Sequence, residues 1–216
     1  IEMFDSPAAL TLLSEVEQLK RSAGESNISI ASTAFNMAAS YFVKGDFVRS
    51  QELCGKALAL TGGKPCQTAL LALGQSVRIA NELGDLECAE KHYERLLQMC
   101  EALKEEPCTD AVEAYVVTCY RQGKYEKAKN IAEETLAKAK AVGSRTRSIA
   151  LLENDLGLIK VELGDIQGAI VNYRNAIDAS KKLWPDGHAF IANEYSNLGV
   201  AYLTAGGPHR ALPMFR

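Results

Sequence analysis

Five stretches of this sequence resemble one another: KGDFVRSQELC (44–54), LGDLECAEKHY (83–93), QGKYEKAKNIA (122–132), LGDIQGAIVNY (163–173) and AGGPHRALPMF (205–215). The second residue of each is a glycine, and successive glycines lie 39, 39, 41 and 42 residues apart: Gly45, Gly84, Gly123, Gly164 and Gly206. A single compact domain has no reason to keep so regular an advance, whereas stacked repeat units do. The sequence therefore predicts a modular chain.

Each of these glycines separates two segments of helix length. A glycine at such a place can adopt the left-handed conformation that ends one helix and turns the chain into the next. Five residues after each glycine comes a small residue, which lets the two helices of a pair approach closely: Ser50, Ala89, Ala128, Ala169 and Ala211. A large residue nine after the glycine, present as Tyr93, Tyr173 and Phe215, is expected to fill the gap towards the next unit.

The helix boundaries follow from these glycines and from the prolines ahead of the pairs. We expect a leading helix within residues 1–25, as a cap or an incomplete repeat, and five helix-pair units over residues 26–216. The predicted pairs are 27–44 with 46–60, 66–83 with 85–104, 108–122 with 124–141, 146–163 with 165–183, and 188–205 with a helix from 208 onward. The last unit is expected to be truncated within its second helix.

The composition argues against membrane and nucleic-acid partners. The chain is 47% hydrophobic and 24% charged, with a formal net charge of -3 and a mean hydropathy of -0.09. This balance is typical of a soluble, folded protein, and no apolar run reaches the roughly 18–20 residues that span a bilayer. Lys and Arg are scattered among Asp and Glu, so no basic stripe is available for phosphates. We expect a cytoplasmic protein.

The cysteines and histidines form no pattern of a metal site or a catalytic site. The six cysteines contain no CxxC pair and no histidine at metal-ligand spacing: Cys54, Cys66, Cys88, Cys100, Cys108 and Cys119. We expect free thiols, with Cys100 and Cys108 as the pair to check for a disulfide because they flank one predicted turn. The three histidines fall in different units, and no phosphate-binding glycine loop follows a strand. We therefore predict neither an enzyme nor a cofactor.

The last unit carries a recognisable signature. Leu198 and Gly199 are followed by Tyr202, then by the loop glycine, Ala211 and Phe215. This order resembles the tetratricopeptide signature, although the spacing of about 40 residues exceeds that family's period of about 34. Units of this length resemble those of kinesin light chains and of Pins/LGN-type scaffold proteins. The resemblance implies an all-α, right-handed superhelical solenoid of antiparallel helix pairs.

In such an array the first helix of every pair lines a concave groove. Counting back ten, nine, six and three residues from each loop glycine gives an inward stripe, from which the candidate peptide-binding residues are Asn36, Phe42, Gln75, Arg78, Glu113, Tyr120, Asn154, Asp155, Leu158, Asn197 and Val200. Amides at these places resemble the inward asparagines of kinesin-light-chain-like arrays, which hydrogen-bond a peptide backbone. The aromatic and aliphatic members would contact apolar side chains of the ligand. Charges of both signs occur, so the stripe as a whole predicts no charge preference.

The resemblance implies a non-catalytic adaptor or scaffold that binds a partner's linear motif or amphipathic helix in the groove. Two alternatives stay open at this point. One is a peptide-gated regulatory switch, since bacterial peptide-pheromone receptors also resemble long helix-pair arrays. The other is a structural or self-assembling segment. A switch would change its superhelical pitch on binding, whereas an adaptor would keep its shape. The sequence leaves the oligomeric state undecided.

Overall fold

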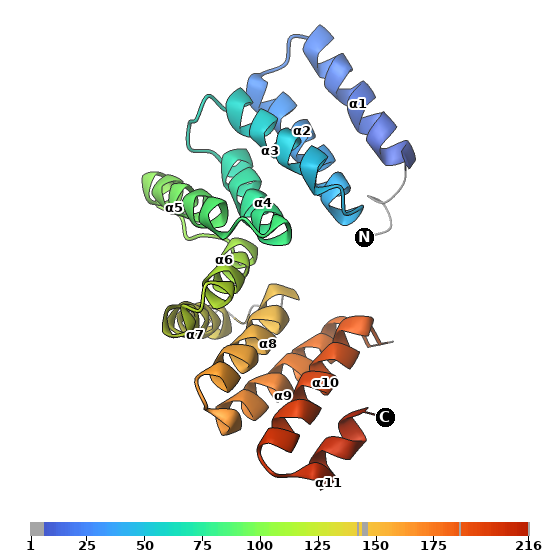
Figure 1. Cartoon of the computed structure of the whole chain (residues 1–216). Helices are drawn as coiled ribbons and strands as arrows, with labels where there is room; N and C mark the ends of the chain where they lie inside the picture. The colour runs from blue at the N-terminus through green and yellow to red at the C-terminus, as the bar shows by residue number, and fades with distance from the viewer. Residues whose placement is uncertain (1–6, 142, 144–146, 186, 216) are drawn as a thin grey trace. The chain divides into compact units, whose positions relative to one another are not determined.

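The computed structural model describes residues 7–141, 143, 147–185 and 187–215, and within them all regular secondary structure is helical (Figure 1). The chain forms two compact units, residues 1–115 (unit 1) and 116–216 (unit 2), so the division falls within one helix. The first six helices are α1 (Pro7–Ser22), α2 (Asn27–Val43), α3 (Phe47–Leu60), α4 (Gln67–Leu83), α5 (Leu86–Leu103) and α6 (Thr109–Arg121). The others are α7 (Tyr125–Ala141), α8 (Arg147–Glu162), α9 (Ile166–Leu183), α10 (Ala189–Thr204), α11 (Pro208–Ala211) and the 3₁₀ helix η2 (Leu212–Phe215).

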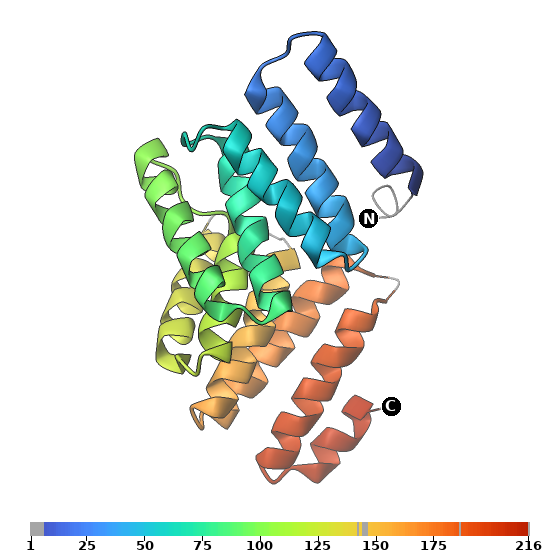
Figure 2. The same ribbon diagram turned by 45° about the horizontal axis from the view of Figure 1, so that its top comes forward.

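In unit 1 consecutive helices pack on one another from α1 to α5, and α2 also contacts α4. Figure 2 shows α1, α2 and α3 side by side in this part of the chain. One buried cluster joins three helices through Ala38, Cys54 and Ile79, and Phe42 and Phe47 pack against it. The leading helix expected within residues 1–25 is α1.

In unit 2 the helices from α7 to α10 also pack consecutively, and α8 contacts α10 as well. One core cluster joins α9, α10 and α11 through eight buried residues: Ala169, Ile170, Tyr173, Ile177, Leu198, Ala201, Tyr202 and Ala211. Because α8 and α10 each precede a loop glycine, they are both first helices of a pair. First helices therefore lie next to one another in unit 2, as α2 and α4 do in unit 1.

The loop glycines have the predicted backbone conformation. All five have positive φ: 76° at Gly45, 77° at Gly84, 72° at Gly123, 81° at Gly164 and 75° at Gly206. After three of them an aspartate caps the next helix, and its carboxylate accepts a backbone N–H three residues on. The Asp46 carboxylate accepts from the Arg49 N–H at 3.1 Å, Asp85 accepts from the Cys88 N–H at 3.0 Å, and Asp165 accepts from the Gly168 N–H at 2.9 Å.

The small residues mark close approaches between paired helices. The five small positions of the second helices are 0% or 1% exposed. In α2 and α3 the approach is close enough for the Ser50 hydroxyl to donate to the Ala38 carbonyl at 2.7 Å. In α8 and α9 a Cβ added to Gly157 would come within 2.5 Å of the Tyr173 ring. Only glycine fits opposite this tyrosine, so the pair of residues fixes how α8 and α9 pack.

The large residues also reach the following pair. The Tyr93 ring stacks on Tyr115 of the next first helix, with 3.9 Å between ring centroids. Tyr173 shares its core cluster with Leu198 and Tyr202 of α10. A single bulky side chain of each second helix therefore contributes to packing both within its own pair and against the next one.

The second helix of the last pair differs from the expected continuous helix. α11 ends at Ala211, and η2 follows from Leu212 to Phe215. Pro213 lacks a backbone N–H, so an α-helical hydrogen bond cannot form at this residue. The Phe215 ring still packs over α10, where a Cβ added to Gly199 would meet it at 2.5 Å.

Candidate functional site

The predicted groove residues of unit 1 lie on the two adjacent first helices, α2 and α4. We call this surface the unit 1 face and define it by Asn36 and Phe42 on α2 and by Gln75 and Arg78 on α4. The Arg78 guanidinium lies over the Phe42 ring, 4.5 Å from its centroid. Arg78 also donates to the Gln75 side-chain oxygen at 3.4 Å. The structure therefore brings Phe42, Gln75 and Arg78 together, although they come from two repeats.

The remaining members of this surface differ in exposure. Gln75 is only 7% exposed, and its Nε2 has no hydrogen-bond partner within the described part of the chain. Asn36 is exposed on α2. Glu113, on the part of α6 that belongs to unit 1, is half-buried. Asn36, Gln75 and Asn197 each lie nine residues before a loop glycine, so the sequence predicted similar accessibility for the three amides. The Gln75 amide is much less accessible than this prediction implies.

In unit 2 two predicted amides meet directly. The Asn197 side chain on α10 donates to the Asn154 side-chain oxygen on α8 at 2.9 Å, and both residues are half-buried. They lie 43 residues apart, which is about one repeat. This bond places equivalent stripes of successive first helices side by side. We call this surface the unit 2 face and define it by Tyr120, Asn154, Asp155, Leu158, Glu162, Asn197, Val200 and Leu203.

A phenol and a carboxylate meet at one end of α8. The Tyr120 hydroxyl donates to Glu162 at 3.3 Å, and Tyr120 also lies 5.5 Å from the Tyr125 ring, between centroids. Burial raises the pKa of Tyr120, and the negative charge of Glu162 raises it further. The Asp155 carboxylate adds to the same upward pKa shift, so it contributes to the field around this phenol. At neutral pH Tyr120 is therefore a hydroxyl donor.

The aliphatic members of the unit 2 face are unequally buried. Leu158 packs against the core cluster between α9 and α10. Val200 and Leu203, one turn apart on α10, are 55% and 51% exposed. A water-exposed aliphatic pair beside polar side chains can bury its surface against a ligand.

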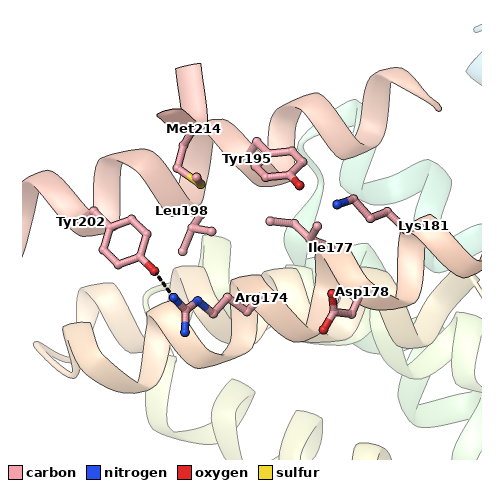
Figure 3. Close-up of a pocket in the computed structure, with 8 residues that line it drawn as sticks. All are labelled: Arg174, Ile177, Asp178, Lys181, Tyr195, Leu198, Tyr202 and Met214. Carbon is pink, nitrogen blue, oxygen red and sulfur yellow. Dashed lines mark hydrogen bonds between the residues drawn. The ribbon is translucent and has the colours of Figure 1, made fainter. Parts of the chain in front are cut away.

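A second concave feature of unit 2 lies outside the predicted stripe. It is a pocket of about 280 Å³ between α9, α10 and η2, lined by Arg174, Ile177, Asp178, Lys181, Tyr195, Leu198, Tyr202 and Met214 (Figure 3). Arg174 donates to the Tyr202 hydroxyl at 2.6 Å, and the Lys181 ammonium lies 5.3 Å from the Tyr195 ring centroid. Both cations are therefore engaged within the pocket wall, and Asp178 offsets part of their charge. The pocket offers no clear charge preference.

Other kinds of site find no support in the described residues. No group of three or more His, Cys, Asp or Glu side chains there is placed to hold a metal ion. All six cysteines are free, so Cys100 and Cys108 form no disulfide in this structure. Among the helices that the structure describes, none combines the length and the apolar character that a membrane span requires.

Counting from the loop glycines missed two features of these surfaces. Glu162 lies two residues before Gly164, outside the counted offsets, yet it accepts the Tyr120 hydroxyl. Five of the eight pocket residues lie on the second helix α9 and on η2, so a stripe of first-helix residues could not contain the whole pocket. A search for an acid beside an aromatic of the preceding first helix would have found Glu162.

Several solved structures share this arrangement of helices. BtubC (BKLC) from P. vanneervenii matches with a TM-score of 0.76 and 17% identity, over 96% of this chain and 85% of that one. A Rap protein complexed with competence and sporulation factor matches with a TM-score of 0.71 and 12% identity, over 86% of this chain and 52% of that one. A putative kinesin light chain of Podosopora anserina with nearly identical TPR-like repeats matches with a TM-score of 0.65 and 16% identity, over 84% of this chain and 90% of that one. No family model and no curated protein matches the sequence.

Proposed function

We propose that this chain, which has the fold of tetratricopeptide-type helical repeats, is a non-catalytic interaction domain that holds a segment of another protein against its first-helix faces. Solenoids of helix pairs present such faces as extended binding surfaces. We further propose that it acts as a cytoplasmic adaptor or scaffold, and that its ligand is a linear motif or an amphipathic helix.

The observation that carries this proposal is the bond between Asn154 and Asn197, at 2.9 Å across one repeat. It aligns polar groups from successive first helices along one surface. An asparagine amide can donate to and accept from a peptide backbone whatever the peptide's side chains are. A row of such amides, flanked by Tyr120 and Val200, suits an extended peptide.

The Rap protein complexed with competence and sporulation factor raises a peptide-gated switch as a second candidate, on the likeness of fold alone. The two candidates differ in what binding does to the protein. An adaptor keeps its conformation, whereas a switch changes the population of its conformations. Small-angle scattering with and without a bound peptide separates them.

The test is a selection of proteome-derived peptides against the chain, repeated with an Asn36→Ala, Tyr120→Ala and Asn197→Ala triple variant. Asn130→Ala serves as the matched control, because Asn130 is an exposed amide on the second helix α7. A shared motif that the triple variant loses and the control keeps is the expected result. A motif that survives the triple variant would place binding on another surface. If all of these proteins are folded and none of them enriches a peptide, the result would favour a structural segment over an interaction domain.

A further inference from the structure

The α8 part of the unit 2 face carries two acids in one row. Asp155, Leu158 and Glu162 are spaced at i, i+3 and i+7 on α8. Side chains at this spacing lie on the same face of a helix. Glu162 is exposed, and within the described residues its side chain accepts one hydrogen bond, from the Tyr120 hydroxyl at 3.3 Å. A carboxylate that accepts a single hydrogen bond keeps further capacity to accept.

Two lysines of unit 2 pair with other carboxylates. Lys160 on α8 pairs with Glu133 at 3.4 Å, and Lys140 on α7 pairs with Glu153 at 3.0 Å. Within the described residues of unit 2, no cation forms an ion pair with Glu162. The Glu162 carboxylate therefore presents a negative charge that the described residues of unit 2 leave without an ion pair.

The α10 part of the same face is aliphatic. Val200 is 55% exposed and Leu203 is 51% exposed, and they follow Asn197 by three and six residues. On α8, Leu158 and Glu162 follow Asn154 by four and eight residues. Since Asn154 bonds Asn197 and both helices run in the same direction, Glu162 and Leu203 lie at a similar height, roughly 9–12 Å along their helices from that bond.

We infer that the unit 2 face binds a partner segment in which a lysine or arginine lies one or two residues from an aliphatic side chain, the cation at Glu162 and the aliphatic group at Val200 and Leu203. Adjacent helices lie about 8–10 Å apart, and an extended peptide covers about 7 Å in two residues. The spacing therefore suits this pattern. The inference rests on the proposed function, and it assigns a charge preference that counting over all first helices together did not give.

The test uses a random dodecapeptide display library as the probe, selected on the full chain and on three variants. Glu162→Gln keeps a hydrogen-bond acceptor for Tyr120 and removes the charge. Val200→Ser removes the exposed aliphatic group. Glu52→Gln is the charge-matched control, because Glu52 is exposed on the second helix α3. Thermal unfolding of each variant shows that the fold is kept.

We expect the full chain and the Glu52→Gln control to enrich lysine or arginine next to an aliphatic residue. Glu162→Gln should lose the preference for basic residues and keep the preference for aliphatic residues. Val200→Ser should keep the preference for basic residues and lose the preference for aliphatic residues. Measured by fluorescence anisotropy, a selected peptide should bind the Glu162→Gln variant about tenfold more weakly, and added salt should narrow this difference because it screens the ion pair.

The outcomes separate this inference from the function on which it rests. Enrichment of a motif without basic residues, or a basic preference that survives Glu162→Gln, overturns the inference and leaves an interaction domain. No enrichment by the full chain, which remains folded, overturns both.

Discussion

The unit 1 face and the unit 2 face use the same repeat positions for different chemistry. Arg78 of unit 1 lies six residues before Gly84, and Val200 of unit 2 lies six residues before Gly206. Arg78 stacks on Phe42, so its charge is engaged within the protein, whereas Val200 is exposed. In contrast to the Arg78 guanidinium, the Glu162 carboxylate of unit 2 is exposed to solvent. The fold determines where a side chain lies, and its identity determines whether it serves the protein or a ligand.

The largest expected effect is a loss of stability in unit 2 while unit 1 stays folded. In Gly157→Val, the new side chain must occupy the space of the Tyr173 ring, which lies 2.5 Å from the position of a Cβ. Overpacking of this kind costs about 3 kcal/mol at its upper end. Hydrogen exchange should show faster exchange of the unit 2 core amides while α2 and α3 keep their protection. Equal loss of protection in α2 and α3 would mean that the two units unfold together.

The second prediction gives unit 2 the residue type that unit 1 has at this offset. Val200→Arg should weaken binding of basic-aliphatic peptides by about tenfold, because the new guanidinium repels the ligand's cation and can pair with Glu162. Val171→Arg is the control, since Val171 is 56% exposed on the second helix α9 and Val200 is 55% exposed. Fluorescence anisotropy against a selected peptide measures both. An equal loss in the control would point to net charge alone.

The third prediction measures what Arg78 does for unit 1. Arg78→Gln removes the contact between its guanidinium and the Phe42 ring, at 4.5 Å from the centroid. The expected loss is about 0.5–1 kcal/mol of unfolding free energy. Val200→Gln, at the same offset in unit 2, should change the unfolding free energy by less than this because its side chain is already exposed. Urea denaturation of both variants decides, and an equal loss would contradict an internal role for Arg78.

The regular parts of this structure could be predicted from the sequence because they depend on local chemistry. Positive φ at Gly45 and Gly84 follows from glycine between two helical segments, and the fully buried Ala89 follows from its distance to Gly84. The contacts across repeats depend on rotamers and on the relative height of the helices. The burial of Gln75 and the bond from Tyr120 to Glu162 therefore could not be derived by counting.

The two units also differ at a buried position of the first helix. Ala72 of unit 1 lies twelve residues before Gly84, Glu194 of unit 2 lies twelve residues before Gly206, and both are 0% exposed. The Ser180 hydroxyl donates to one Glu194 oxygen at 2.7 Å, while Oε2 accepts no bond from the described residues. Burial raises the pKa of Glu194 above its usual value of 4.5, although the Ser180 bond opposes this shift. The last repeat therefore tolerates a carboxyl group at the position where the repeat of Gly84 has the methyl group of Ala72.

The smallest expected effect appears only when pH is varied. Since the pKa of Glu194 is raised in the folded state, folding favours its protonated form. Its contribution to stability is complete below pH 4.5 and is lost as pH rises through the raised pKa. Glu194→Gln stays neutral and can still accept from Ser180, so it should raise the unfolding midpoint at pH 7 by roughly a few degrees. This advantage should shrink as the buffer approaches pH 4.5. A constant difference across that range would show that the substitution acts through packing and not through the charge.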